Sequence, residues 1–418
     1  MLDINLIREN PEKVKEGAKN KGYDLKIVDR VLKVDETRRQ LIAEVEKWRQ
    51  ERNRLTRKDI TKGKKIKEML RRLEPDLKAV EEQVRGLLYQ IPNLPADDVP
   101  VGKDESENVE IKKWPARPSG GGQPKKFPFK PKAHFELGES LDLIDTQRAA
   151  KVSGTRFGYL KNEAVWLELA LVRLAFETLT KEGFKPVIPP VMISTESMRA
   201  MGYLEGKEKD ERYILEKDDL VLVGTSEQAI GPMHKGEIFQ EGNLPKRYVA
   251  FSTCFRREAG SYGKDTKGIL RVHQFNKVEM FSFTKPENSN KEHEYFLSLE
   301  EKLMQKLKLP YRVVKMCTGD LGAPAARKYD IEAWFPAEKC YRETHSTSTC
   351  TDFQARRLNI KFKRKRGNLE LVHTLNGTAF SERPILAILE NYQQKDGSVL
   401  VPAVLQKYLG FKEISSKK

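Results

Sequence analysis

The chain has few of the features that are typical of secreted proteins, of proteins with a structural zinc site or of membrane proteins. It holds only four cysteines in 418 residues (Cys254, Cys317, Cys340 and Cys350), and no two are spaced as C-x-x-C. This argues against a disulfide framework and a structural zinc site, and we expect free thiols in a reducing compartment. No apolar run approaches a membrane span, and the first residues lack the apolar core of a signal peptide. We therefore expect a cytoplasmic protein with no membrane association.

Apolar residues are also scarce, whereas basic residues are in excess. Hydrophobic residues make up 38% of the chain, and 77 Lys and Arg outnumber 61 Asp and Glu, giving a formal net charge of +16. This balance favours a polyanionic partner, although solubility alone explains a smaller excess. The length predicts two domains, and the low hydrophobic content is sufficient if part of the chain is a solvated helical arm.

Residues 25–91 predict an antiparallel helical hairpin. Helix breakers are few, and from Ile66 to Ile91 apolar residues recur at alternating steps of four and three, which is a heptad seam. A polar turn around Gly63 separates the two limbs, and Pro75 should kink or restart the returning helix. Helices of about 25 to 30 residues would extend about 40 Å.

The far end of this hairpin is strongly basic. Residues 47–72 contain twelve Lys or Arg and three acidic residues. Such an excess suits an arm that contacts the phosphates of a folded RNA and recognises its shape. The candidate contacts are Arg54, Arg57, Lys64 and Lys65. The alternative is a dimerising coiled coil whose charges only keep it soluble.

The rest of the chain predicts an α+β body built on an antiparallel sheet. Residues 101–133 are rich in Pro and Gly and are expected to be a linker between a first domain at 1–100 and a second at 134–418. In the second domain, helical patterns at 163–181 and 292–308 alternate with short strand-like runs.

The most informative stretch lies at residues 255–281. Its flanks alternate polar and apolar residues as half-buried strands do, and a loop rich in Gly, Ser and Asp joins them. Residues two apart on a strand face the same way, so Arg256 and Glu258 should lie beside Phe275 and Glu279 of the partner strand. Arginine matches phosphate oxygens, a carboxylate accepts from an exocyclic amine, and an aromatic ring covers a base, so the surface suits a nucleoside triphosphate. The alternative is a surface hairpin with charged cross-strand pairs.

This stretch resembles motif 2 of the class II aminoacyl-tRNA synthetases, at about 248–283. The string CFRREAG, followed by HQF and VE, is similar to the seryl-tRNA synthetases in particular. The resemblance implies that Arg256 binds the α-phosphate of ATP, that Glu258 binds adenine and that Glu279 contacts serine. It also implies that the arm at 25–91 holds the long variable arm of a serine tRNA.

Three further segments carry the same resemblance. GFKPVIPPVMI at 183–193, the end of a motif 1 at about 170–193, places two prolines at a sheet edge and implies a homodimer interface. VLVGTSEQAIGPMHKG at 221–236 is similar to the T-x-E loop that binds the amino acid, whereas the residues alone also fit a helix N-cap. HTLNGTAFSERPILAILENYQ at 373–393 resembles motif 3, with the turn before Arg383 one residue shorter than the common form.

The segment KCYRETHSTSTCTDFQARR at 339–357 resembles the family signature that contains the magnesium ligands. It implies that Glu343 and Ser346 offer oxygen ligands to Mg²⁺, a hard cation shared with phosphates. The chain departs from the usual residues at three positions, His345, Thr347 and Thr349. We expect His345 to be a packed or solvent-facing substitute and not a catalytic base.

As a whole, the resemblance implies a ligase that activates L-serine with ATP to seryl-adenylate and transfers the seryl group to the 3′ end of serine tRNA. The residues leave open whether selenocysteine tRNA is also a substrate. The expected catalytic residues are Arg256, Arg383 and Glu343. The expected serine contacts are Thr225, Ser226, Glu227, Glu279 and Thr378. The expected ATP contacts are Arg256, Arg257, Glu258, Arg271, Val272, Phe275, Glu343, Thr344, His345, Ser346 and Arg383.

Two rival classes of protein stay open. One is another class II synthetase with a small substrate such as threonine or proline; the lack of a Cys/His zinc constellation opposes the first, and the arm opposes both. The other is a relative that loads a carrier protein or only binds RNA. A carrier-loading relative should lack the arm, and an inactive one should have lost the motif arginines.

Overall fold

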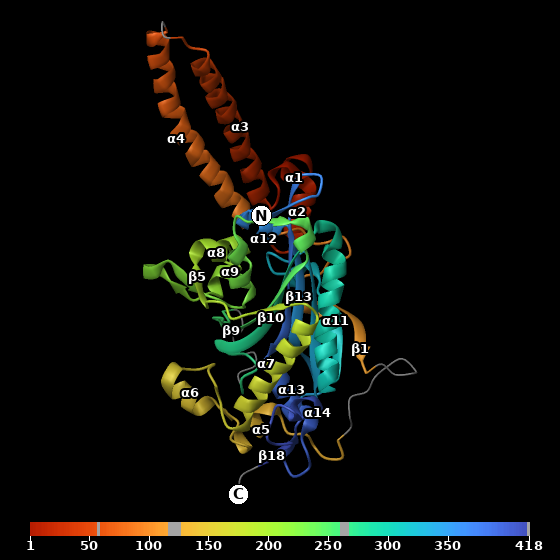
Figure 1. Ribbon diagram of the computed structural model, residues 1–418. Coiled ribbons are helices and arrows are strands. Elements are labelled where there is room, and N and C mark those ends of the chain that lie inside the picture. The colour runs from red at the N-terminus through yellow and green to blue at the C-terminus, as the bar shows by residue number, and fades with distance from the viewer. Residues whose placement is uncertain (57–58, 116–126, 260–266, 416–418) are drawn as a thin grey trace. The chain divides into compact units, whose positions relative to one another are not determined.

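We describe the protein from a computed structural model, in which residues 1–56, 59–115, 127–259 and 267–415 are described (Figure 1). Two compact units are present, Met1–Leu94 and Pro95–Lys418. Within the described residues, no helix is long and apolar enough to cross a membrane. The predicted α+β class with an N-terminal helical hairpin is confirmed.

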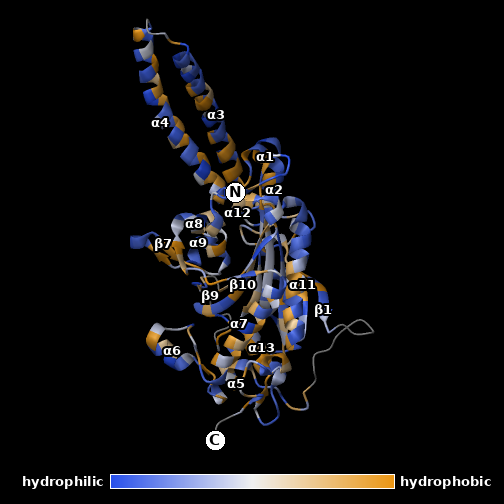
Figure 2. Cartoon of the chain, viewed as in Figure 1, coloured by the Kyte–Doolittle hydropathy of each residue, from blue (hydrophilic) through white to orange (hydrophobic). Residues whose placement is uncertain are grey.

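The first unit is entirely helical. Its elements are α1 (Ile4–Glu9), α2 (Pro11–Asn20), α3 (Lys26–Asn53) and α4 (Ile60–Gln90). The long helices α3 and α4 form the hairpin, whose ribbon in Figure 2 is mostly hydrophilic with apolar patches. Its seam consists of buried or half-buried apolar residues: Leu41, Val45, Trp48, Leu55, Ile66, Leu70, Leu73 and Leu77. The heptad pattern on the returning limb therefore corresponds to real packing.

Charged pairs accompany the apolar seam of the hairpin. Arg49 of α3 bonds Glu74 of α4 at 2.9 Å. Asp35, which is buried, accepts from Arg8 of α1 at 2.6 Å and from Arg38 at 2.7 Å. The expected restart of the helix at Pro75 is wrong, since α4 runs as one element through this exposed proline. Leu73 and Leu77, two residues to either side of Pro75, pack in the seam of the hairpin.

The second unit is built on an eight-stranded sheet in the order β1-β11-β12-β13-β16-β10-β9-β4. Its strands are β1 (Val109–Trp114), β4 (Lys185–Val187), β9 (Lys246–Phe255), β10 (Gln274–Thr284), β11 (Tyr311–Lys315), β12 (Arg327–Phe335), β13 (Cys340–Thr351) and β16 (His373–Ser381). All neighbours are antiparallel except β4, which pairs in parallel with β9 at the edge. Two helices of this unit closely follow the predicted patterns, α7 (Glu163–Lys181) and α11 (Ser289–Leu307); together with α13 (Arg383–Tyr392) they share one apolar core with the sheet.

Smaller elements complete this unit. The helices are α5 (His134–Ser140), α6 (Thr146–Ser153), α8 (Thr195–Met201), α9 (Lys207–Asp210), α10 (Glu227–Ile230), α12 (Phe353–Leu358) and α14 (Ala403–Gln406). The strands are β2 (Ile144–Asp145), β3 (Tyr159–Leu160), β5 (Met192–Ser194), β6 (Ile214–Leu215), β7 (Leu220–Leu222), β8 (Ile238–Gln240), β14 (Lys361–Lys363), β15 (Leu369–Leu371), β17 (Val399–Leu400) and β18 (Glu413–Ile414).

The segment expected to be a linker needs a correction. Of the expected linker at 101–133, residues 116–126 lie outside the described residues, and the described part includes β1, which pairs antiparallel with β11 and forms the other edge of the large sheet. Four of its six residues are exposed, so the strand shows no alternation of buried and solvated positions that a sequence pattern could reveal. Its backbone hydrogen bonds to β11 and the stacking of Trp114 on Tyr311 hold it in the sheet.

Candidate active site

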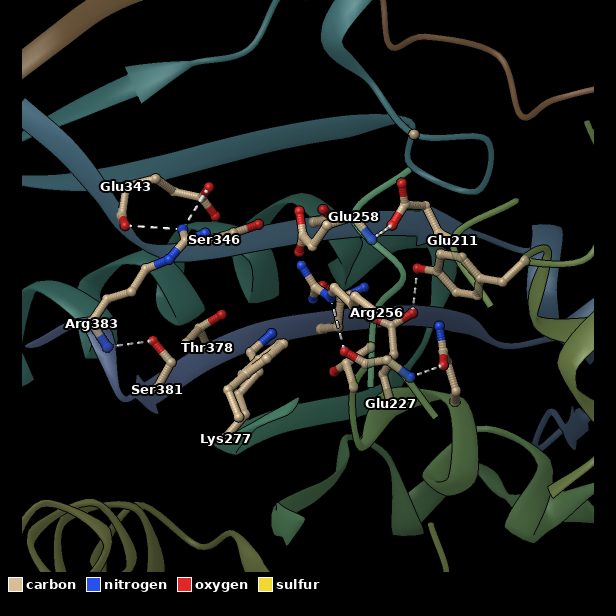
Figure 3. Close-up of a pocket in the computed structure, with 18 of the residues that line it drawn as sticks. Glu211, Glu227, Arg256, Glu258, Lys277, Glu343, Ser346, Thr378, Ser381 and Arg383 are labelled. Atoms are coloured by element: carbon tan, nitrogen blue, oxygen red, sulfur yellow. Dashed lines mark hydrogen bonds and ion pairs between the residues drawn. The ribbon is translucent and has the colours of Figure 1, made fainter. Parts of the chain in front are cut away.

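One cavity of about 390 Å³ opens on a face of the large sheet, and most of the predicted site residues lie around it (Figure 3). Its walls come from β10, β13 and β16, from the loop between β7 and α10, and from residues on either side of the β9–β10 loop. Adjacent strands are thus what bring together residues more than a hundred positions apart in the chain.

Arg256 and Glu258 enter this cavity from the end of β9. The Nε–H of Arg256 donates to the carbonyl oxygen of Gly224 at 3.1 Å, and its guanidinium lies 5.2 Å from the ring centre of Phe275. Glu258 has a left-handed backbone with φ of 52°, which for a non-glycine residue costs about 1 kcal/mol or more. Its carboxylate accepts from Arg271 at 2.6 Å. The predicted grouping of arginine, acid and aromatic ring is present.

Glu227 lies buried on the opposite side of the cavity from Arg383 (Figure 3). Its carboxylate accepts the hydroxyl proton of Tyr203 at 2.6 Å. Burial, and then the charge of Glu279, raise the pKa of Glu227 to about 7, although the Tyr203 bond and Lys277 oppose the shift. A buried carboxyl that needs a positive partner is well suited to an ammonium group.

The neighbouring groups add a second acid and two hydroxyls. Lys277 and Glu279, two apart on β10, form an ion pair at 2.5 Å. Thr378 lies opposite Glu279 in the pairing of β10 with β16. The hydroxyl of Thr225 is buried and has no hydrogen-bond partner among the described residues. Together with Glu227, these groups offer small, polar, directional contacts.

Arg383 and Glu343 face each other at the other side of the cavity (Figure 3). Arg383 donates to the carbonyl oxygen of Glu343 at 3.0 Å and lies 2.9 Å from its carboxylate. Desolvation opposes ionisation of Glu343, but Arg383 and then Lys328 outweigh it and hold the pKa of this carboxyl far below its usual range. Ser346, on the same strand, lines the same cavity. An ionised carboxylate and a hydroxyl are hard oxygen donors, so the two residues fit a magnesium ion.

Comparison with known proteins identifies the family. The seryl-tRNA synthetase N-terminal domain model matches residues 1–95, and the class II tRNA synthetase core domain model (G, H, P, S and T) matches residues 211–392. The serine–tRNA ligase of Dictyoglomus turgidum is 46% identical over the full length of both chains. The chain belongs to the seryl-tRNA synthetase family.

Solved structures of the family agree over the same length. The crystal structure of seryl-tRNA synthetase from Pyrococcus horikoshii complexed with ATP superposes with a TM-score of 0.93 at 44% identity and covers 100% of both chains. That of the cytoplasmic serine–tRNA ligase from Naegleria fowleri in complex with AMP gives a TM-score of 0.89 at 35% identity, covering 100% of this chain and 99% of the other.

Four residues predicted from the family resemblance do not line the cavity wall. Arg257 points to Tyr213, with 5.9 Å between its guanidinium carbon and the ring centre. Ser226 is buried and bonds the hydroxyl of Ser252 at 2.7 Å. Glu279 is buried against Lys277, and His345 is completely buried. Any contact of these four with a substrate therefore has to run through the backbone or through a neighbouring side chain.

The three departures from the family pattern on β13 share one structural explanation. Ser346 and Ser348 line the cavity, so the alternating His345, Thr347 and Thr349 face away from it. There they bond other elements: His345 to the carbonyl oxygen of Ala379 at 2.9 Å, Thr347 to that of Asn376 at 2.8 Å, and Thr349 to Ser289 at 3.1 Å. The three departures therefore lie on the face of β13 that is turned away from the cavity.

The same bond gives His345 a defined role in the structure. Its Nε2–H must be the donor because a carbonyl oxygen only accepts, and burial lowers the pKa of His345 to about 3, so the ring is neutral. Ala379 is the residue skipped between Val278 and Glu279 in the pairing of β10 with β16, a β-bulge. His345 is thus packed, one of its two expected placements, and bonds the bulge in β16, the strand that precedes Arg383.

Several cavity residues were not predicted. Lys277 could have been found, because it lies two residues before Glu279 on one strand face. Lys328 pairs with Ser348 across β12 and β13, which only the strand register reveals. Glu382 is held uncharged at neutral pH, because burial and then Glu168 raise its pKa to about 8. Glu211 and Arg212 come from a loop that carries no recognisable motif.

Proposed function

We propose that this chain is a serine–tRNA ligase, which activates L-serine with ATP and transfers the seryl group to the 3′ end of serine tRNA. One observation carries the proposal: a single cavity combines two arginines suited to phosphates, Arg256 and Arg383, with the buried acid Glu227, in a chain that matches serine–tRNA ligases over its full length.

The proposed activation step needs no nucleophile from the chain. A carboxylate oxygen of serine bonds the α-phosphorus of ATP, and the bond from that phosphorus to pyrophosphate breaks. Arg256 would face the charge that develops on the α-phosphate, and Arg383 that on the γ-phosphate, so catalysis is alignment and charge stabilisation. Glu343 and Ser346 would hold magnesium, which supplies further neutralisation of the phosphates when bound.

Serine would be held by the buried polar groups around Glu227. The carboxylate of Glu227 suits the substrate ammonium, while Thr225 and Thr378 would contact the hydroxyl or the backbone of a small amino acid. Glu279 does not line the cavity wall and would act through its ion pair with Lys277. Glu258 and Phe275 would bind adenine, with Arg271 supporting Glu258. A second step follows, in which the terminal ribose hydroxyl of the tRNA attacks the acyl carbon and AMP leaves.

Pyrophosphate exchange across all twenty amino acids tests this function. We expect serine alone to drive efficient ATP–pyrophosphate exchange, since the buried hydroxyl of Thr225, unbonded within the described chain, and the acid Glu227 match a small polar substrate. Strong exchange with threonine, proline or alanine and none with serine would overturn the proposal.

The elevated pKa of Glu227 predicts a pH dependence that is specific to serine. Below a pKa of about 7 the carboxyl is neutral and cannot pair with the ammonium, so kcat/KM for serine should rise with pH through this value. From about pH 6 to about pH 8 the increase should be about tenfold. Glu227→Gln should weaken serine binding and abolish the rise of kcat/KM for serine with pH. In the parent protein, kcat/KM for ATP at saturating serine should not show this rise. A flat serine profile in the parent protein contradicts the role.

We further propose a homodimer through motif 1, as the family resemblance implies. Large apolar side chains are exposed on α7, directly after β4 and at the start of β5: Val165, Trp166, Leu169, Ile188 and Met192. Such a patch on a chain of this kind marks a protein interface. Sedimentation should give twice the chain mass of 48.1 kDa, and a monomer at all concentrations would exclude the dimer.

The basic end of the hairpin is our proposed contact for tRNA, and a cytoplasmic location would follow from that substrate. Arg54, Lys64 and Lys65 are exposed, and no ion pair engages them within the described part of the chain. Arg57, the fourth predicted contact, lies outside the described residues. Exposed cations of this kind are available to phosphates.

A further inference from the structure

Glu211 makes an unusual set of contacts at the start of the β9–β10 loop. It follows α9, and its carboxylate accepts two hydrogen bonds, from the backbone N–H of Glu258 at 3.0 Å and from that of Ala259 at 2.9 Å. Its own carbonyl oxygen accepts a third from the N–H of Arg257 at 3.1 Å. Three successive N–H groups of one turn thus donate to a single residue from a distant part of the chain.

The turn that Glu211 holds has a conformation that it would not keep by itself. Glu258 lies in the left-handed region with φ of 52°, where L side chains are rare, and it persists only where surrounding contacts determine it. The ladder of β9 and β10 ends just before, with Phe255 opposite Gln274. Beyond that ladder, the N–H of Arg256 still bonds the carbonyl oxygen of His273 at 2.9 Å. The three bonds to Glu211 therefore hold residues 257–259, which follow Arg256.

This turn decides which way the neighbouring side chains point. Arg256 and Glu258 line the cavity, while Arg257 between them turns outward over Tyr213. Figure 3 shows Glu211 and Glu258 next to each other at the same side of the cavity. The carboxylate of Glu211 bonds the backbone of the turn, whereas the side chain of Glu258 lines the cavity and accepts from Arg271.

We infer that Glu211 is a positioning residue for nucleotide recognition: by holding the turn of Arg257, Glu258 and Ala259, it presents the carboxylate of Glu258 to the amino group of adenine before ATP binds. The inference rests on the proposed function, because it assumes that the cavity binds ATP. Preorganisation of this kind strengthens binding by removing the cost of ordering the group on contact.

Glu211→Ala is the decisive variant. In serine-dependent pyrophosphate exchange it should raise KM for ATP by about tenfold to about a hundredfold, the usual range for losing charged hydrogen bonds, and leave KM for serine within about twofold. Glu211→Gln keeps an acceptor oxygen, so its KM for ATP should lie between that of Glu211→Ala and that of the parent. Glu216→Ala, an exposed acid a few residues further on, is the matched control and should behave as the parent.

The preference of the enzyme for ATP over other nucleoside triphosphates distinguishes a positioning role of Glu211 from a general structural role. The triphosphate of purine riboside lacks the 6-amino group, so the parent should prefer ATP over it, and this preference should collapse in Glu211→Ala. In a Glu258→Ala protein, adding Glu211→Ala should then change the KM for ATP little, because both substitutions remove the same contact with adenine. An unchanged ATP KM and base preference, or equal losses for ATP and serine, would overturn the inference. The proposed function fails separately, if the parent shows no serine-dependent exchange at all.

Discussion

Replacing Arg256 by alanine should lower the rate of serine-dependent pyrophosphate exchange by at least about a hundredfold while the fold survives. Within the described residues, only the Nε of Arg256 is bonded, to the carbonyl oxygen of Gly224, so the rest of the guanidinium is available to a phosphate. The side chain lies over Phe275 at the rim of the ladder, and its removal leaves the strands paired. Single-turnover formation of seryl-adenylate measures the loss directly.

Arg257→Ala is the matched control for that experiment. This neighbour carries the same charge, but its side chain lies over Tyr213 and outside the cavity wall, so its loss should be much milder. Circular dichroism and thermal unfolding should show both variants folded. If Arg256→Ala activates serine at the parental rate, or if Arg257→Ala is the more damaging of the two, the assignment of Arg256 to the α-phosphate is incorrect.

Removing the outer part of the hairpin should abolish tRNA charging and spare amino-acid activation. A suitable deletion takes residues 44–79, cut five positions inward on each helix from the Arg49–Glu74 pair, and joins the ends by a short Gly-Ser linker. It leaves the Asp35 network with Arg8 and Arg38 in place. Among the described residues, those that line the cavity all belong to the second unit, so exchange with serine should continue. Loss of serine-dependent exchange in a folded deletion variant would contradict the assignment of activation to the second unit and of tRNA binding to the hairpin.

A gentler variant tests the charges themselves. Replacing Arg54, Lys64 and Lys65 by Gln should weaken tRNA binding and flatten its log–log dependence on salt by up to about one unit for each phosphate that is no longer neutralised. The exchange rate without tRNA is the internal control and should not change. An unaltered affinity and salt slope would mean that these cations are only a solvated surface.

Much of the fold and the site could be predicted because it depends on local periodicity. The heptad positions of α4 become the seam with α3, and the alternation around Arg256 becomes the β9–β10 ladder that carries Phe275. The elements that have no periodic sequence pattern were not predicted. Strand β1 is largely exposed at a sheet edge, and helix α4 continues through Pro75, with Leu73 and Leu77 packed in the seam to either side.

The limits of prediction within the site have the same physical origin. The order of the amino acids shows which chemical groups the chain carries and which of them share a strand face, because the two-residue repeat of a strand follows from backbone geometry alone. The folded structure sets the environment of each of these groups. It turned His345 away from the cavity, raised the pKa of Glu227 by burying it beside Glu279, and brought Glu211 to the turn at Glu258. Burial, charge proximity and such contacts depend on residues far apart in the chain, and no local pattern encodes them.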